Sequence, residues 1–327
     1  MTSIDPTEPD RTVPPLESRP AMLLDCDPGH DDAVAIIAAA RYADLVGITT
    51  VAGNASLERT TYNARVMRDM LRIDVPIHSG CDRPLEVEPV SGDYIHGDSG
   101  LDGADLPPPT TPIDGVDAVS FIVETCRATE GVWLVPTGPL TNVALALDRA
   151  PDIAARVAGI SLMGGGSFGN RTAAAEYNIW ADPHAAQRVF GYGGRLVMAG
   201  LDVTHRFQAT PSRIAEVRAL PGRLAAVLAD LFDFFTAAYL RRHDRGALAG
   251  AAVHDPLAVL AVTHPELFTR IDRHVAIETA DSLTRGMTVI DERRLVERRP
   301  PTAEMLIDVD DDAAFGVVLE AVAHFSR

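Results

Sequence analysis

The sequence predicts a single α/β domain built on an open, mostly parallel β-sheet with helices on both faces. Short apolar runs alternate with longer segments of helical character from residue 21 to the end of the chain. This alternation is typical of parallel sheets, because each parallel connection needs a crossover about as long as a helix. Neither a linker nor an internal repeat interrupts residues 21–327, so we expect one domain there.

The order of the individual elements supports this fold class. Buried or β-branched runs predict the strands, and Ala-rich or amphipathic runs predict the helices. The predicted strands cover residues 22–24, 45–51, 75–77, 132–135, 159–163, 195–198, 274–278, 286–290 and 304–309. The predicted helices cover residues 31–41, 57–72, 117–128, 139–149, 183–190, 223–241, 255–263 and 311–325. Residues 81–116 are expected to form a long loop, and such loops are often functional.

Residues 1–20 differ from the rest of the chain. They contain five prolines among polar and acidic neighbours. A segment of this composition has few apolar side chains to bury, so we expect a flexible tail ahead of the domain.

The composition excludes several classes of function. Apolar residues make up 46% of the chain and charged residues 23%, which is a normal globular balance. With 46 acidic and 29 basic residues the net charge is −17, which would repel nucleic acid and anionic membranes. Every basic residue is an arginine, so the chain cannot use a catalytic or phosphate-binding lysine.

The cysteine pattern and the absence of targeting signals indicate a cytoplasmic protein. Cys26, Cys81 and Cys126 are widely spaced, which offers neither a disulfide framework nor a CxxC metal site. The first residues lack the basic-then-apolar order of a signal peptide. No apolar run is long enough to span a membrane. We therefore expect a soluble, reduced protein.

Four aspartates gather where the first predicted strand meets the first predicted helix. They are Asp25, Asp27, Asp31 and Asp32. One Asp at a helix start is an ordinary N-cap worth about 1 kcal/mol, but a cap uses only one carboxylate. Converging carboxylates repel one another unless a cation is bound or some of them are protonated. Because the segment lacks the Cys and His ligands that Zn²⁺ prefers, a hard cation such as Ca²⁺ or Mg²⁺ is the simplest expectation.

A second candidate for metal binding is the sequence His254-Asp255-Pro256. Proline at the first helical position makes Asp255 a natural N-cap. Asp182 also precedes a proline, and there we expect a cap only. The apolar run at 247–253 would deliver His254 and Asp255 to a buried helix start, which favours a functional role for this pair.

Eight ordered blocks of the sequence resemble the nucleoside hydrolases, the inosine–uridine-preferring N-ribohydrolase family. They span nearly all of residues 21–325. The blocks are LLDCDPGHDDAVAI at 23–36, TTVAGN at 49–54, IHGDSG at 95–100, VPTGPLTN at 135–142, LMGGG at 162–166, AEYNIWADPHAA at 175–186, LDVTH at 201–205 and AAVHDP at 251–256.

The resemblance implies a Rossmann-like sheet, Ca²⁺-dependent hydrolysis of the N-glycosidic bond of ribonucleosides, and one Ca²⁺ in the pocket. By motif position the ion would be bound by Asp27, Asp32, the backbone carbonyl of Thr137, and Asp255. Asp27 would also act as the general base toward a water on the ion, with Asp25 as support.

The resemblance also implies which residues bind the ribonucleoside. The sugar would be held by residues of four of these blocks and of the loop after LMGGG. They are Asp31, Asn54, Met163, Asn170, Glu176, Tyr177 and Asn178. Tyr239 could lie over the base. Assembly as a homodimer or homotetramer is implied in the same way.

The chemistry of these residue types fits the implied reaction. Cleavage of a nucleoside passes through an oxocarbenium-like sugar cation, which nearby carboxylates favour. The leaving base departs more easily when it is protonated, and histidine can supply that proton near neutral pH. His254 is the first candidate for this acid and His96 the second.

Three departures from the family pattern leave the preferred base open. Spacing is uncertain around His243, the loop at 167–170 is one residue short, and Tyr94 stands where a histidine is expected. Gly164 to Gly166 cannot form a P-loop without lysine, so we expect close backbone approach to the sugar there.

Two other functions compete with this interpretation. The Asp25-Cys26-Asp27 sequence after a strand resembles the start of a haloacid-dehalogenase-type phosphatase, although that class usually needs a lysine or arginine for the phosphate. The second alternative is a Ca²⁺-dependent nucleoside-binding protein without turnover, against which the presence of Asp27 argues.

Overall fold

The central sheet has eight strands in the order β3-β2-β1-β4-β5-β6-β12-β9. The structure is a computed structural model that describes residues 18–90, 92–241, 248–294 and 299–326. Every neighbouring pair in this sheet is parallel except β12 and β9, which are antiparallel. The strands are β1 (Ala21–Cys26), β2 (Asp44–Thr50), β3 (Ile77–Ser79), β4 (Trp133–Pro136), β5 (Gly159–Met163), β6 (Leu196–Ala199), β12 (Ala303–Val309) and β9 (Phe268–Arg273).

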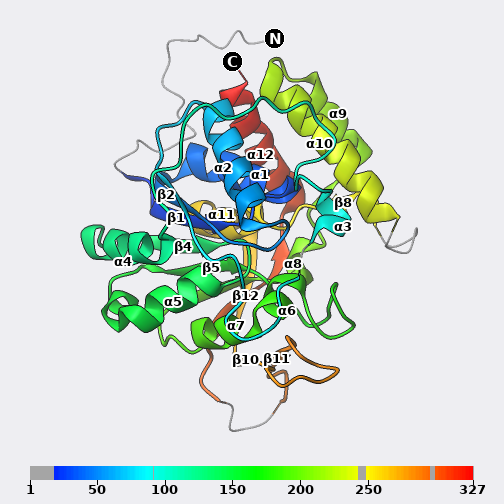
Figure 1. Cartoon of the computed structure of the whole chain (residues 1–327). Helices are drawn as coiled ribbons and strands as arrows, with labels where there is room; N and C mark the ends of the chain where they lie inside the picture. Colours follow the sequence, from blue (N-terminus) through cyan, green and yellow to red (C-terminus); the bar gives the residue numbers. More distant parts are fainter. Residues whose placement is uncertain (1–17, 91, 242–247, 295–298, 327) are drawn as a thin grey trace.

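Helices cover both faces of the sheet (Figure 1). One face carries α1 (His30–Tyr42), α2 (Leu57–Leu71), α11 (Pro256–Thr263) and α12 (Asp311–Phe325), with α9 (Pro211–Ala219) and α10 (Arg223–Leu240) packed beyond them. The other face carries α4 (Ala118–Ala128), α5 (Thr141–Arg149) and α7 (Pro183–Phe190). The sheet thus separates two apolar clusters, and the buried side chains of β1 contribute to both.

The strand order places a crevice at the middle of the sheet. The chain leaves β1 toward β2 on one side and returns to β4 on the other, so the winding direction reverses between β1 and β4. In doubly wound sheets the carboxyl ends of the strands at such a reversal form the ligand crevice. The residues that follow β1 and β4 are therefore the ones placed to form a site.

The remaining elements are short and lie around the sheet. Two small antiparallel sheets pair β10 (Val275–Ile277) with β11 (Thr288–Ile290), and β7 (Gln208–Ala209) with β8 (Ala251–Ala252). The short helices are α3 (Asp93–His96), α6 (Tyr177–Ala181), α8 (Leu201–Thr204), and the 3₁₀ turns η2 (Pro151–Ala155) and η3 (Pro265–Leu267).

The predicted fold class is confirmed, with differences at the periphery. The strand predicted at 75–77 lies at 77–79, and the predicted strands near 275 and 288 pair with each other outside the main sheet. Helix α9 and the antiparallel edge strand β9 were not predicted, and within the described residues of the long loop at 81–116 the one helix is the short α3. Most of the predicted tail, residues 1–17, lies outside the described residues. Within the described part of the chain, no helix is both long and apolar enough to cross a membrane.

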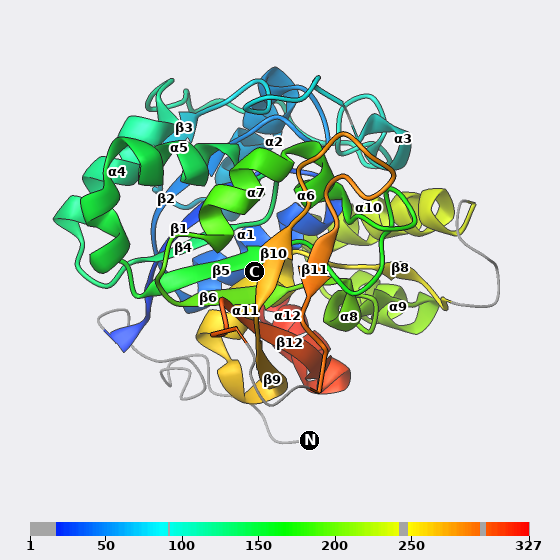
Figure 2. The ribbon, with the colours of Figure 1, turned by 90° about the horizontal axis from the view of Figure 1, so that it is seen from below.

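The β10–β11 hairpin holds the loop that follows β5. Figure 2 shows this hairpin beside α6. The Thr288 hydroxyl donates to the carbonyl of Gly166 (2.7 Å) and accepts from the Gly166 N–H (2.9 Å). Gly166 has φ +154° and an added Cβ would lie 3.1 Å from Leu201 Cβ, which favours glycine here. One buried hydroxyl thus satisfies both backbone groups of Gly166.

Replacing Thr288 by valine should lower the free energy of unfolding by about 2 kcal/mol or more. The substitution keeps the shape but leaves two buried backbone groups unpaired, each costing about 1–3 kcal/mol. Urea denaturation measures this change. The matched control is Val289→Thr on the adjacent side chain, which is 46% exposed, and we expect it to change stability by less than about 0.5 kcal/mol. Equal stability of the two variants would contradict the assigned role of Thr288.

Candidate active site

A pocket lies over the carboxyl ends of β1, β2, β4 and β5, at the reversal of the sheet. Its empty volume is about 530 Å³, which includes the open mouth. The lining residues come from the loops after these strands and from α3, α6, α10 and the start of α11. They are Asp31, Asn54, Gly92, Ile95, His96, Thr137, Met163, Asn170, Glu176, Tyr177, Asn178, Phe235, Tyr239, His254 and Asp255.

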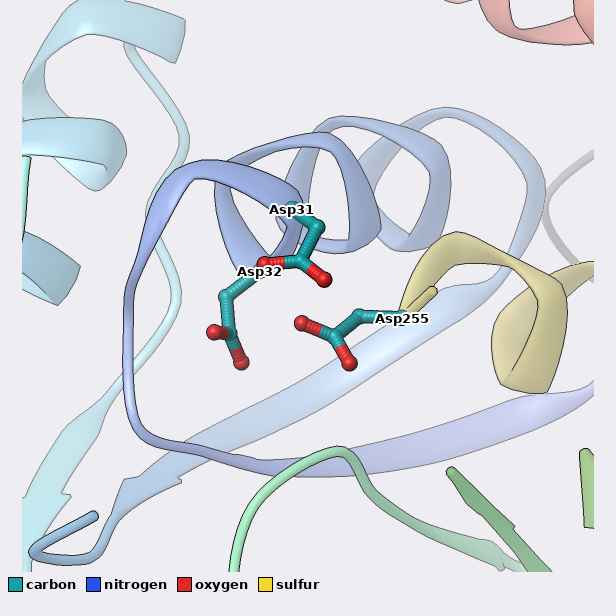
Figure 3. A group of neighbouring side chains, drawn as sticks. All are labelled: Asp31, Asp32 and Asp255. Atoms are coloured by element: carbon teal, nitrogen blue, oxygen red, sulfur yellow. The ribbon is translucent and has the colours of Figure 1, made fainter. Parts of the chain in front are cut away.

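Three carboxylates meet at the floor of this pocket. Asp31 and Asp32 project from the first turn of α1, and Asp255 points toward them from the start of α11 (Figure 3). One oxygen of each lies within 4.8 Å of the others, and all three side chains are buried. A parallel sheet permits this meeting because α1 and α11 both begin at the same edge.

Asp27 lies beside this group and is completely buried. Its Oδ2 accepts the N–H of Asn54 at 2.7 Å, while its Oδ1 has no hydrogen-bond partner among the described residues. The two glycines that flank it are required sterically, since a Cβ on Gly53 or Gly138 would lie 2.1 or 2.4 Å from its carboxylate oxygens. At both glycines the backbone itself therefore packs against the Asp27 carboxylate, one oxygen of which has no hydrogen-bond partner among the described residues.

The turn Pro28-Gly29 aims the carboxylates inward. Gly29 is the N-cap of α1, and its N–H donates to Asp32 Oδ2 at 3.0 Å. A Cβ at Gly29 would lie 2.6 Å from Nδ1 of His96, so only glycine allows α3 to approach α1 this closely. The helix start thereby brings acidic side chains and a histidine to one pocket.

Burial and mutual repulsion disfavour the charged form of every carboxylate in this group. Burial is the main cause that raises the pKa of Asp25 and of Asp31 to about 7. The pKa values of Asp27, Asp32 and Asp255 are also raised, first by burial and, for Asp27 and Asp255, further by the neighbouring aspartates. A bound cation would remove this penalty.

The donor set fits a hard divalent cation. All of the candidate ligands are oxygen atoms, which suit Ca²⁺ or Mg²⁺ better than a softer metal. Asp27 Oδ1 and Asp31 Oδ1 are buried without a hydrogen-bond partner among the described residues. A bound cation could coordinate both oxygens. The predicted ligands Asp32 and Asp255 lie together with Asp31, which the family resemblance assigns to the sugar. Asp27 lies near this group, since its pKa is raised first by burial and then by the charges of Asp32 and Asp31.

Thr137, the fourth predicted ligand, lies between the acidic group and α6. Its hydroxyl donates to Asp32 Oδ1 at 2.8 Å, and its carbonyl accepts from the Asn178 amide at 2.8 Å. A carbonyl oxygen has two lone pairs, so this contact leaves one for another partner.

The residues expected to bind the sugar line one side of the pocket. Asn54 donates to Asp32 Oδ2 at 3.1 Å, and Asn178 donates to the carbonyl of Met163 at 3.2 Å. Asn170 accepts from the backbone N–H of Tyr177, whose hydroxyl donates to the carbonyl of Gly53. Hydrogen bonds to other parts of the chain thus hold each of these side chains in the pocket wall.

Glu176 does more than line the pocket. Its carboxylate is the N-cap of α6 and accepts three backbone N–H groups, from Gly165, Asn178 and Ile179. Burial nevertheless raises its pKa to about 7. The backbone of the glycine segment is thus held at Gly165 by Glu176 and at Gly166 by Thr288.

Another part of the pocket lining is aromatic. Tyr239, His96 and His254 are among the residues that line the pocket. Burial lowers the pKa of His96 well below its usual range, so that ring is neutral at pH 7. His243, the alternative candidate on the segment before His254, lies outside the described residues, as does the side chain of Tyr94.

Two residues at this aromatic side were missed by the sequence analysis. Phe235 lines the pocket and lies one helical turn before Tyr239, a spacing that could have identified it. His30 is buried behind His96, and the Nδ1 atoms of the two rings are 3.1 Å apart. The Nε2 atom of His30 lies 2.8 Å from the carbonyl oxygen of Asp102. Nothing in the sequence distinguishes His30 from its motif neighbours, because its partner is 66 residues away.

Comparison with known proteins agrees with this fold. The chain belongs to the inosine–uridine preferring nucleoside hydrolase family, whose model matches residues 22–316. It is therefore an enzyme of the nucleoside hydrolase class, and the phosphatase and non-catalytic alternatives are excluded.

Particular relatives span the whole domain. The pyrimidine-specific ribonucleoside hydrolase RihA of Enterobacter sp. (strain 638) is 40% identical, over 93% of this chain and 98% of its own length. RihA of Escherichia coli (strain SMS-3-5 / SECEC) is 42% identical, over 88% and 94%. Among solved structures, the purine-preferring ribonucleoside hydrolase from Gardnerella vaginalis superposes with a TM-score of 0.87 at 31% identity, covering 94% of this chain and 99% of that one.

The carboxylate pocket makes stability depend on pH when no cation is present. The raised pKa values of Asp31 and Glu176, about 7, exceed the value of about 4 in the unfolded chain. The native state therefore binds more protons than the unfolded chain between these pH values. The stability that these two protonated groups contribute at low pH is lost as the pH rises from about 4 to about 7. The rise in Tm on adding Ca²⁺ to chelator-treated protein should be larger near pH 7.5 than near pH 5, because protons compete with the cation.

Differential scanning fluorimetry with and without Ca²⁺ at each pH measures this difference. Because the same protein is compared at one pH, titration of groups elsewhere cancels. A Ca²⁺-induced rise in Tm that is independent of pH, or no rise at all, would contradict a cation site at these carboxylates.

Proposed function

We propose that this enzyme is a Ca²⁺-dependent ribonucleoside N-glycosidase that hydrolyses nucleosides to the free base and ribose. The observation that carries the proposal is the buried group of Asp31, Asp32 and Asp255, with Asp27 beside it, at the floor of a pocket whose other walls are amide-rich and aromatic. Negative charge below and aromatic rings beside a sugar suit a reaction that develops positive charge on that sugar.

The cation would be held by Asp27, Asp32, Asp255 and the carbonyl of Thr137, with Asp31 close enough to share it. When bound, such a cation lowers the pKa of a coordinated water and aligns neighbouring hydroxyl oxygens. We assign Ca²⁺ rather than Mg²⁺ because the donors come from three separate segments, an irregular set that suits the flexible coordination of Ca²⁺.

Asp27 and His254 would divide the proton transfers between the two ends of the scissile bond. As the bond between C1′ and the base nitrogen breaks, its electron pair stays on the nitrogen, which takes a proton from the imidazolium form of His254 and leaves that ring neutral. Water adds its oxygen to C1′ and gives its proton to Asp27 Oδ1, the oxygen without a partner among the described residues. The sum is nucleoside plus water to ribose plus base, and exchange with solvent returns both side chains to their starting forms.

The sugar and the base would be bound by opposite walls. Asp31, Asn54, Asn170, Glu176 and Asn178, with the backbone of Met163, offer hydrogen-bond partners to the sugar hydroxyls. Tyr177 supports this wall through its bond to Gly53.

The base would lie against Phe235 and Tyr239, with His254 and His96 at its edge. Pyrimidine nucleosides are the proposed substrates, because the curated relatives at 40–42% identity are named as pyrimidine-specific. We further propose a role in salvage of bases, a cytoplasmic location, and assembly as a homodimer or homotetramer, all by resemblance to the family.

Release of ribose from a panel of nucleosides tests the proposed activity. Uridine and cytidine should be hydrolysed faster than inosine, and chelator should abolish the activity until Ca²⁺ is restored. 2′-Deoxyuridine should react up to about 10⁴-fold more slowly, since polar groups built to bind a hydroxyl would be left unpaired. Equal rates on uridine and 2′-deoxyuridine would show that the diol is not recognised, and activity unaffected by chelator would contradict the metal dependence.

Substituting Asp27 by asparagine should lower kcat at least about 10²-fold, because a general base contributes about 10²–10⁴-fold and a cation ligand is lost as well. Steady-state kinetics with uridine measure the loss. Asp98→Asn, on an exposed side chain outside the pocket, is the matched control and should keep the original rate. An Asp27 variant with more than about a tenth of the original rate would rule out this residue as the general base.

A further inference from the structure

The helix after β6 ends against the histidine at the base side of the pocket. Thr204 is the last residue of α8, and its side chain is completely buried. Its Oγ1 lies 2.8 Å from Nδ1 of His254, fifty residues further along the chain. Thr204 does not line the pocket, whereas His254 does, so the hydroxyl contacts the ring from behind.

The direction of this hydrogen bond follows from the partners of the hydroxyl. Among the described residues, His254 Nδ1 is the one hydrogen-bond partner of Thr204 Oγ1. The nearest carbonyl one turn earlier, that of Gly200, already accepts the N–H groups of Val203 and Thr204. If Nδ1–H donated, the buried hydroxyl proton would have no acceptor, at a cost of about 1–3 kcal/mol. The hydroxyl therefore donates, and Nδ1 accepts.

This direction fixes the tautomer of the neutral ring. Nδ1 carries the lone pair, so the proton is on Nε2. Because Nδ1 is hydrogen-bonded to Thr204, which does not line the pocket, while His254 does, we infer that the Nε2 edge of the ring faces the pocket. A proton there faces the space that we assign to the base.

Neighbouring groups hold the ring in this orientation. The backbone N–H of His254 donates to Asp31 Oδ2 at 3.3 Å, which anchors its main chain to the acidic group. The ring lies beside those of His205 and Tyr239, with centroids 5.6 and 6.3 Å away. Since Tyr239 Oη is 3.4 Å from His205 Nε2, these two rings also support each other.

We propose that Thr204 is a positioning residue that holds the His254 ring through Nδ1, in the orientation that turns Nε2 toward the leaving base. This inference rests on the proposed role of His254 as the acid. It assigns to the LDVTH segment a function in catalysis without contact to substrate, because Thr204 acts only through the imidazole.

The direct test is the tautomer of the neutral ring. Nitrogen-15 NMR of the Ca²⁺-loaded enzyme, with the His254 signals assigned by their loss in His254→Ala, distinguishes a protonated Nε2 from a protonated Nδ1. We expect a single Nε2–H form in the original enzyme and a mixture or a changed form in Thr204→Val. An Nδ1–H form in the original enzyme would overturn the proposal without reference to activity.

The kinetic test uses two leaving groups. Thr204→Val keeps the shape but removes the donor, and we expect kcat for uridine to fall about tenfold to hundredfold with little change in KM. Nitrophenyl riboside, whose leaving group needs no proton, should lose less than about threefold, since only the acid is affected. An equal loss on both substrates would show that Thr204 merely supports the fold.

Two variants control for loss of a buried hydroxyl. Thr204→Ser retains the donor and should restore most of the uridine rate and the Nε2–H signal. Thr61→Val removes a buried hydroxyl pair with Thr50 (2.7 Å) away from the pocket and should leave both substrates unaffected. A serine variant as slow as the valine variant would contradict the assigned donor.

His254→Ala separates failure of this inference from failure of the proposed acid. If this variant leaves uridine hydrolysis intact, the acid assignment fails and the positioning role with it. If it slows uridine selectively while Thr204→Val does not, the acid stands and the positioning role is overturned.

Discussion

The burial of several carboxylates at one point is the constraint on which the rest of this structure depends. Asp27, Asp31, Asp32 and Asp255 lie within the protein at the edge of its central sheet, where none can be hydrated freely. Backbone N–H groups donate to these carboxylates, and glycines stand where a side chain would collide with them. Their oxygen atoms together form a set suited to a cation. Because little water screens these buried carboxylates, their electrostatic interaction with a bound cation or with positive charge on a substrate is strong.

The two walls of the pocket are ordered by different means. On the sugar side, side chains bond to backbone groups of neighbouring loops, and Glu176 alone accepts three N–H groups. On the aromatic side, order comes from rings in contact and from residues one layer back: His30 behind His96, and Thr204 behind His254. A site that is fixed before the substrate binds loses less conformational entropy during the reaction.

The fold was predictable where local pattern and burial agree. The core strands near Leu24, Val135 and Leu162 are buried on both faces and therefore read as apolar runs. Helix α12 was predicted at its observed bounds, because its apolar spacing and the Asp310 cap are local signals. The edge strand β9 depends instead on antiparallel pairing with β12, thirty or more residues away, which no local pattern specifies. The strands at β10 and β11 were predicted, but their pairing with each other outside the main sheet was not.

By itself, the sequence determined the fold class, the acidic junction after the first strand and the family, because each is carried by contiguous residues. Only the tertiary structure decided which of these carboxylates meet. It brought Asp255 to Asp31 and Asp32 across more than two hundred residues, and left Asp27 beside them with one oxygen lacking a partner among the described residues. It also placed His30, Phe235 and Thr204 around the pocket. The physical reason is that a parallel sheet gathers the ends of all its strands at one edge, and the sequence does not record which of those ends become neighbours.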